Sequence, residues 1–195
     1  SHEFQQFFFP LLMVGFGVLA GLWPFHTWSP DGHVAAPTAV SMVHAGVLMK
    51  LGAFGIIRVG LMLMPDGAAA WMPVLVGLGT VNVLYGAWSA MGQTDLKYVI
   101  GYSSVSHMGY VFMGIATLHT LGMGGAVLQM FSHGIMTALL FAAVGTVYDR
   151  THTRDIAVLE GLAHRMGFTA VVFAVAGLAS LGLPGLSGFV AELLV

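Results

Sequence analysis

Long apolar stretches separated by short polar segments dominate the pattern of hydrophobic and polar positions along the chain. Three stretches contain no Asp, Glu, Lys or Arg at all: residues 67–94, 98–148 and 166–191. A helix of about 20 predominantly apolar residues is long enough to cross the hydrocarbon core of a bilayer. The pattern therefore predicts an all-α protein whose helices span a membrane.

Six hydrophobic segments are predicted as transmembrane helices: 7–28, 36–64, 71–92, 97–118, 123–148 and 168–195. Short segments rich in turn-forming residues separate them. Thr94 or Asp95 can serve as the N-cap of the fourth helix. The longest polar segment, 148–167, is predicted as an extramembrane connection with a short amphipathic helix from Asp155 onward.

Prolines predict that two of the six helices are discontinuous. Pro24, Pro30 and Pro37 interrupt the first helix, and Pro184 interrupts the sixth within "GLPGLSG". Non-helical backbone at membrane depth must be buried in protein or line a wet cavity, and discontinuous helices recur in ion-translocating proteins. An ordinary kink is the alternative interpretation of each proline.

Basic residues predict the orientation of the chain in the membrane. With six spans, one side carries three loops: 29–35, 93–96 and 149–167. The same side holds four basic residues, Lys97, Arg150, Arg154 and Arg165, whereas the loops on the other side contain no Lys or Arg. The positive-inside rule makes the basic side cytoplasmic, or matrix or stromal in an organelle, and 149–167 a cytoplasmic loop.

Composition supports a multi-pass membrane protein and excludes several other classes. Hydrophobic residues make up 57% of the chain and charged residues 7%, whereas a soluble domain carries about 25% charged residues. A net charge of −2 offers no basic patch for nucleic acid. Without cysteine, HExxH spacing, a nucleophile elbow, a phosphate loop or a dinucleotide fingerprint, the chain is expected to carry no catalytic residue, metal or cofactor.

Four ionisable side chains lie well inside the predicted helices: Lys50, His107, His133 and Glu192. A charged residue at the centre of a membrane helix costs about 2.5–3.5 kcal/mol on insertion scales and usually marks an ion pathway or an internal ion pair. Histidine titrates near neutral pH, so these residues are a candidate proton pathway. The structural alternatives are a fixed ion pair for Lys50 and hydrogen-bonded core histidines.

Two further residues complete the candidate pathway. Lys97 lies at the end of the fourth helix, on the basic side. His44 precedes Lys50 by six residues, which places it on roughly the opposite face of the second helix. Direct contact between His44 and Lys50 is therefore not expected.

Six strings in order resemble the antiporter-like membrane subunits of respiratory complex I: "PFHTWSPDGHVAAPTAVS", "GVLMKLGAFGIIR", "QTDLKYVIGYSSVSHMGYV", "QMFSHGIMTALLF", "HTRD" and "LGLPGLSGFVAEL". The resemblance covers nearly the whole chain. Within that family the chain is most similar to subunit M, the bacterial counterpart of mitochondrial NADH dehydrogenase subunit 4. Mrp-type cation/proton antiporter subunits share the family fold.

The resemblance implies a fold of fourteen transmembrane helices with two inverted five-helix repeats, each containing a discontinuous helix. Residues 1–195 would form a single transmembrane region from the seventh to the early twelfth helix, within the second repeat. Lys50 matches the proton-carrying lysine of the family's eighth helix, and His107 and His133 match its connecting histidines. Glu192 matches the acid of the twelfth helix. Leu19 stands where the family usually has a seventh-helix lysine.

The resemblance further implies a proton-translocating subunit of NADH:quinone oxidoreductase that carries no redox centre or cofactor of its own. Its partners would be sister antiporter-like subunits, lipid and protons, in a bacterial plasma membrane or an organellar inner membrane. Two alternatives remain open. One is an Mrp-type subunit that exchanges Na⁺ or K⁺ for protons, and the other is a non-pumping scaffold, which Leu19 favours.

Overall fold

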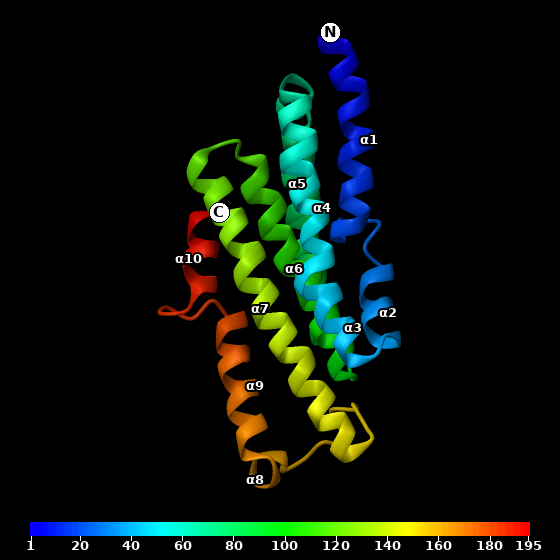
Figure 1. Cartoon of the computed structure of the whole chain (residues 1–195), viewed down its shortest axis with the longest axis vertical. Coiled ribbons are helices and arrows are strands. Elements are labelled where there is room, and N and C mark those ends of the chain that lie inside the picture. The colour runs from blue at the N-terminus through cyan, green and yellow to red at the C-terminus, as the bar shows by residue number, and fades with distance from the viewer.

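The computed structural model describes residues 1–195 as a bundle of helices that run roughly along one axis (Figure 1). The α-helices are α1 (His2–Ala20), α2 (Trp28–Ala35), α3 (Thr38–Val43), α4 (Met49–Gly55), α5 (Pro65–Met91), α6 (Leu96–Ala116), α7 (Thr120–Thr151), α8 (Leu162–Arg165), α9 (Gly167–Ser180) and α10 (Ser187–Leu194). Two π-helical stretches, η1 (His44–Leu48) and η2 (Ile56–Leu61), join α3 and α4 into one continuous helical run.

Four helical runs are long and apolar enough to cross a membrane: His2–Ala20, Thr38–Leu61, Pro65–Met91 and Thr120–Thr151. They correspond to four of the six predicted spans. The fourth predicted span is the 21-residue helix α6, which serines, tyrosines and His107 make less apolar. The sixth is divided between α9, with 14 residues, and α10, with 8.

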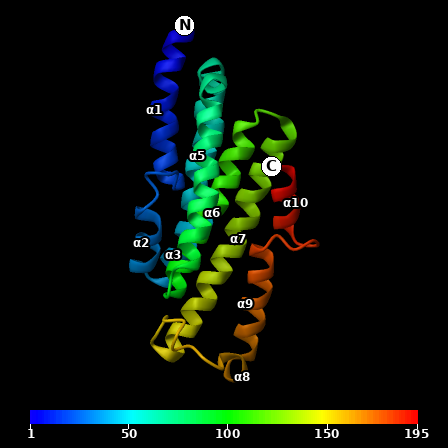
Figure 2. The same ribbon diagram turned by 180° about the vertical axis from the view of Figure 1, so that it is seen from behind.

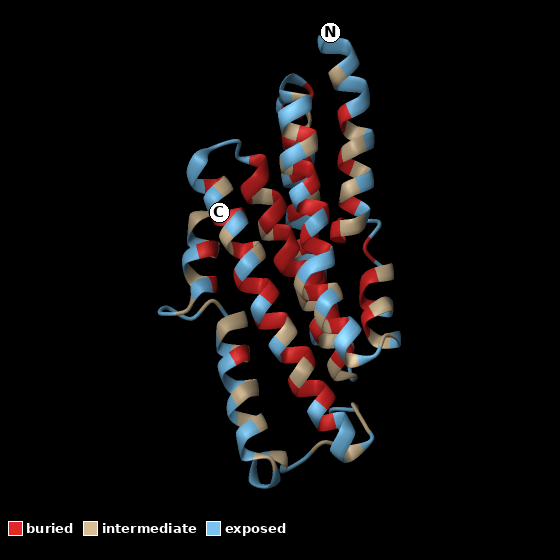
Figure 3. Cartoon of the chain, viewed as in Figure 1, coloured by how far each residue is buried: buried red, intermediate tan, exposed pale blue.

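The polar character of α6 follows from its place in the bundle. It lies between α5 and α7, and most of its residues are buried (Figure 3). Its serines therefore face other helices, where they can donate to main-chain carbonyls. Ser104, for example, donates to Ile100 within the helix and Ser106 donates to Val83 of α5. Polar residues of a membrane helix are tolerated when they face the bundle interior in this way.

The predicted break in the first helix is present, although α1 ends earlier than the expected residue 28. Gly21 closes α1 in the left-handed conformation, with φ 80°, which glycine adopts without strain. The unwound backbone that follows is held by Asn82 of α5. This buried side chain accepts from the Trp23 N–H at 2.7 Å and donates to the Gly21 carbonyl at 2.8 Å. One amide thus satisfies main-chain groups that apolar surroundings would leave unpaired.

The predicted break in the sixth helix separates α9 from α10. Residues 181–186 form the connection, in which Gly182 and Gly185 have positive φ angles of 62° and 101°. A hydrogen bond of 2.7 Å between the hydroxyls of Ser132 and Ser187 fixes the start of α10 against α7. The break therefore places α10 beside α7 with a defined orientation.

The connections after α5 and α7 lie together at one end of the molecule, which we call the basic end (Figure 2). The Leu96 N–H donates to the Arg154 carbonyl at 3.0 Å, and Arg154 Nε lies 3.2 Å from Asp95 Oδ2. Asp95 also caps α6, accepting from the Lys97 N–H at 2.7 Å, as one of the two predicted N-caps. The amphipathic helix predicted from Asp155 is wrong, because only the four residues of α8 are helical there.

Close approach of α5 and α6 yields a test of this packing. A Cβ atom at Gly109 would lie 2.6 Å from the Gly79 carbonyl oxygen, whereas a Cβ at the exposed Gly77 would meet nothing within 4 Å. Overpacking a tight site costs about 1–3 kcal/mol. Gly109→Val is expected to lower the midpoint of thermal unfolding in detergent clearly more than Gly77→Val. Equal midpoints for the two variants would contradict this helix packing.

Candidate functional site

Four of the predicted pathway residues lie in one row across the bundle, each on a different helix. Lys50 Nζ on α4 and His133 Nδ1 on α7 are 2.7 Å apart. The rings of His133 and His107, the latter on α6, have centroids 5.0 Å apart. His107 Nδ1 lies 3.4 Å from Glu192 Oε1 on α10. We call these four residues the central row.

Lys50 has no carboxylate partner among these residues. Its side chain is 8% exposed, and its ammonium group hydrogen-bonds to His133 and donates to the main-chain carbonyl of Ala45. Ala45 belongs to η1, one of the π-helical stretches, which occur frequently at functional sites. A fixed ion pair, the structural alternative for Lys50, is therefore absent from the described chain.

Gln129 joins the two ends of the His107–Glu192 pair and was not predicted from the sequence. Its amide nitrogen donates to Glu192 Oε1 at 3.3 Å and lies 3.2 Å from His107 Nδ1. The other ring nitrogen of His107 lies 3.2 Å from the Ser180 hydroxyl of α9. Gln129 precedes His133 by four residues on α7, so the two share one helix face. That spacing of two polar residues in an uncharged stretch is the signal that could have identified it.

The remaining predicted residues, Lys97 and His44, lie apart from the central row, near the basic end. Lys97 Nζ donates to the Ala36 carbonyl at 2.7 Å and to the Ser41 hydroxyl at 3.3 Å. The His44 ring lies 4.4 Å from the ring of His33, between centroids. We call Lys97, Ser41, His33 and His44 the entry cluster. As expected, His44 makes no hydrogen bond with Lys50.

His33 is a second residue that the sequence did not reveal as a candidate. It is fully buried, and its carbonyl accepts from the Ser41 hydroxyl at 2.8 Å. Its Nε2 lies 3.3 Å from the hydroxyl of Ser29, which also donates to the sulfur of Met49. Because Met49 precedes Lys50 on α4, Ser29 connects His33 of the entry cluster to the helical turn that carries Lys50.

Several buried ring nitrogens have no hydrogen-bond partner in the chain. They are both nitrogens of His26, Nδ1 of His33, Nε2 of His44 and Nε2 of His133. An unsatisfied buried polar group costs about 1–3 kcal/mol, and ordered water ordinarily satisfies such groups. The surroundings of the central row and of the entry cluster are therefore suited to bound water.

Helix α1 supplies no ionisable group near the central row. Leu19 is half-buried in the last turn of α1, and no residue from Phe4 to Ala20 can titrate. The nearest titratable residue after the break is His26, which is buried against the ring of Tyr85 at a centroid distance of 5.0 Å. Helix α1 therefore contains no ionisable residue that could replace the lysine for which Leu19 stands.

The chemistry available to these side chains is proton transfer. Imidazole can donate at one nitrogen and accept at the other, lysine is a donor when charged, and a carboxylate accepts. No three His, Asp or Glu side chains lie close enough together to hold a metal ion. A row of alternating donors and acceptors through apolar surroundings can hand a proton from one group to the next.

Comparison with protein families places the whole chain in one group. The family described as "NADH:quinone oxidoreductase/Mrp antiporter, TM" matches residues 2–195. NAD(P)H-quinone oxidoreductase chain 4 2 of Thermosynechococcus vestitus is 49% identical over 183 residues, which are 94% of this chain and 34% of that protein. The chain thus spans about a third of the length of the curated relatives it matches.

Two solved complexes contain a subunit with the same fold. Respiratory complex I from Thermus thermophilus with bound NADH matches with a TM-score of 0.94 and 32% identity, covering 100% of this chain and 42% of that chain. The Mrp complex from Dietzia sp. matches with a TM-score of 0.90 and 27% identity, covering 95% of this chain and 35% of that chain. The predicted resemblance is confirmed, and the protein is an integral membrane protein. The fold alone does not separate the two kinds of complex.

The contact between Gly182 and Glu192 yields a test of how the row is positioned. A Cβ atom at Gly182 would lie 2.5 Å from Glu192 Oε2, whereas one at Gly185 would meet nothing within 4 Å. Both glycines have positive φ, so alanine at either position is strained by about 1–2 kcal/mol. Only Gly182→Ala is expected to move the carboxylate beyond hydrogen-bonding distance of Gln129, as cryo-electron microscopy of the variant complex would show. An unmoved carboxylate would refute this role of Gly182.

Proposed function

We propose that this chain, which belongs to the NADH:quinone oxidoreductase/Mrp antiporter family, conducts protons in a membrane subunit of a complex I-type NAD(P)H:quinone oxidoreductase. The observation that carries the proposal is the central row, which links Lys50 to Glu192 through two histidines. Electron transfer elsewhere in the complex would supply the energy. The chain itself contributes no redox centre.

The relatives favour this function over cation/proton exchange. The chain is 49% identical to a protein named NAD(P)H-quinone oxidoreductase chain 4 2 and 27% identical to its match in the Mrp complex. A scaffold role accounts poorly for the central row. Four ionisable residues in membrane helices carry a free-energy cost that a purely structural helix bundle could avoid.

Lys50 is the group whose proton the rest of the row would receive. No carboxylate in the described chain pairs with its ammonium group. The nearest acceptor is His133 Nδ1 at 2.7 Å. From there the proton would pass through water or ring movement to His107 and then to Glu192. A charged group brought near Lys50 by the rest of the complex would reload it.

The entry cluster would deliver protons from the basic end. Lys97 bonds the Ser41 hydroxyl, which donates to the His33 carbonyl, and the His33 ring leads through Ser29 to Met49, the neighbour of Lys50. The positive-inside rule makes this end cytoplasmic. Protons would then enter from the cytoplasm and leave beyond Glu192, toward the outer compartment.

Within the whole subunit, residues 1–195 would provide the seventh to early twelfth of fourteen helices, in the second inverted repeat. The two discontinuous helices fit that assignment. Sister antiporter-like subunits and lipid would surround the chain in a bacterial plasma membrane or an organellar inner membrane. With Leu19 in place of the family's seventh-helix lysine, Lys50 would be the remaining lysine at the centre of this pathway.

Gln129 would control the last transfer, from His107 to Glu192. With its amide nitrogen toward both groups, it favours an unprotonated His107 Nδ1 and a charged Glu192. Turned over, the amide would present its oxygen, which has no partner in the present orientation, to a proton on either group. The present orientation therefore matches the pair without the transferred proton, and the turned-over orientation matches the pair while either group holds it.

Replacing Lys50 tests the proposal directly. Lys50→Met in the assembled complex is expected to remove this subunit's share of the protons pumped per electron, because no other group lies within hydrogen-bonding distance of His133 Nδ1. Lys50→Arg keeps the charge but does not release its proton near neutral pH, so it should fail equally. The measurement is proton uptake by vesicles during quinone reduction.

Two results would contradict the proposal. Unchanged proton stoichiometry in Lys50→Met would exclude Lys50 from the pathway, and full activity of Lys50→Arg would show that only a fixed charge is required. Proton exchange that depends on Na⁺ or K⁺ and proceeds without quinone reduction would favour the Mrp-type alternative.

Replacing Gln129 tests whether its amide controls proton transfer between His107 and Glu192, since the four residues of the central row remain in place. Gln129→Leu removes both amide contacts, and the pumping rate is expected to fall by about tenfold or more, since positioned proton-transfer groups contribute large rate factors. Thr146→Ala, on the same helix, serves as the control because the exposed Thr146 hydroxyl bonds only the Ala142 carbonyl within α7. A Gln129→Leu complex that pumps as fast as Thr146→Ala would exclude control by Gln129.

A further inference from the structure

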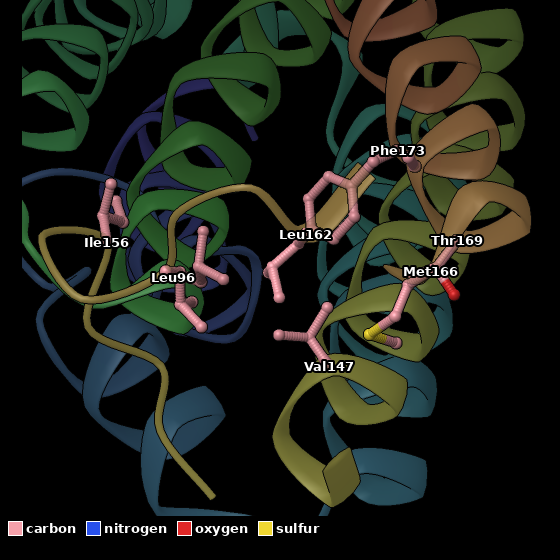
Figure 4. A pocket seen from close by; sticks show the side chains of 9 residues that line it. Leu96, Val147, Ile156, Leu162, Met166, Thr169 and Phe173 are labelled. Carbon is pink, nitrogen blue, oxygen red and sulfur yellow. The ribbon is translucent and has the colours of Figure 1, made fainter. Parts of the chain in front are cut away.

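An apolar cavity of about 290 Å³ lies at the basic end, between α6, α7 and α9 and the segment that leads into α9. Eight of its nine lining residues are hydrophobic. The side chains of Leu96, Val147, Leu162 and Met166 point into a common space, which Phe173 of α9 closes from one side (Figure 4). Helices α7 and α9 are therefore incompletely packed against each other at this level.

A second, polar cavity of about 610 Å³ adjoins the first, and Leu162 and Met166 line both. The polar cavity is lined by two arginines, Arg150 in the last turn of α7 and Arg165 at the end of α8, together with His164 and one acidic residue, Glu160. Neither arginine forms an ion pair within the chain, whose salt bridges involve other residues. The polar cavity thus has a net positive lining.

Along the helix axis the apolar cavity is followed by the polar one, as hydrocarbon is followed by head groups at a membrane boundary. The apolar cavity extends along the first two turns of α9, where Thr169, Ala170 and Phe173 line it. The polar cavity lies at the end of α7 and along α8, outside the apolar stretch that starts at residue 166. A molecule with an apolar tail and an anionic head would fit both cavities at once.

We propose that the two cavities together bind one anionic phospholipid. Part of an acyl chain occupies the apolar cavity, and the phosphate lies between Arg150 and Arg165, whose planar guanidinium groups match phosphate oxygens. The rest of the tail follows the outer face of α9, where Phe168 is 85% exposed and Val171 62% exposed. A quinone head group is neutral and would leave the two arginines without a counter-charge.

The bound lipid would stabilise the contact between α7 and α9. These helices carry His133 and Ser180, which belong to the central row and its surroundings. The proposal does not depend on proton transport, because it is argued from the shape and charge of the two cavities. A scaffold subunit with the same cavities would bind the same lipid.

The experiment uses the purified complex that contains this chain, in nanodiscs with phosphatidylglycerol that carries a photoreactive diazirine in its acyl chain. Illumination is expected to attach the lipid to residues of the apolar cavity, located by peptide mass spectrometry. An excess of unlabelled phosphatidylglycerol should prevent the labelling, whereas phosphatidylcholine or inorganic phosphate at equal concentration should not.

Substitutions of the two arginines test binding of the lipid phosphate, and a substitution in the apolar cavity tests binding of the acyl chain. Arg150→Gln with Arg165→Gln is expected to lower the labelling about thirtyfold, since each basic residue near an anionic lipid contributes roughly a fivefold factor. The matched control, Arg150→Lys with Arg165→Lys, keeps the charge and should retain most of the labelling. Ala170→Phe fills the apolar cavity and should abolish labelling there while leaving both arginines in place.

Three results would overturn the proposal. Labelling that survives the double Gln substitution would exclude the arginines as phosphate ligands, and equal competition by phosphatidylcholine or inorganic phosphate would exclude an anionic lipid. Attachment of the diazirine only outside the apolar cavity would show that no acyl chain occupies it. A polypeptide of the complex bound in the cavity would show that a protein segment, and not a lipid, fills it. Thermal unfolding of each variant complex ensures that a loss of labelling is not a loss of folding.

Discussion

The cost of placing the Lys50 ammonium group inside a helix bundle is the constraint on which the rest of the structure depends. A buried cation normally requires a carboxylate, and here it meets His133 and a main-chain carbonyl instead. Unlike a carboxylate in a fixed ion pair, an imidazole can accept a proton at one nitrogen and donate one at the other. The neighbouring contacts, from His133 to His107 and from His107 to Glu192, provide acceptors in sequence. A costly group without a counter-charge is thus what makes the row suited to conduct protons.

The bundle accommodates these groups because its irregular backbone is satisfied from within. Asn82 bonds both sides of the break after α1, and Gly182 in the α9–α10 connection leaves room for the Glu192 carboxylate. The same breaks bring two short helices to the bundle: α2, which carries His33, packs on α6, and α10, which carries Glu192, packs on α7. The breaks in the helices therefore help to determine where the ionisable side chains lie.

Sequence analysis predicted the features that depend on neighbouring residues. The apolar segments, both proline breaks, the Asp95 cap and the four ionisable members of the central row follow from residue type and spacing. Gln129, His33 and Ser180 escaped prediction because their importance comes from contacts between helices distant in the chain, which periodicity does not encode. The ends of α1 and the short α8 were misplaced for a related reason, since packing against other helices decides where a helix stops. The division between the central row and the entry cluster likewise required the three-dimensional structure.

Infrared difference spectroscopy of the assembled complex during quinone reduction tests most directly whether the central row carries protons. The account predicts a carboxyl band that appears and disappears with turnover, is absent in Glu192→Gln, and is lost in Lys50→Met although Glu192 itself is unchanged. A carboxyl band that persists in the Lys50→Met complex, or no protonation change at Glu192 during turnover, would contradict it.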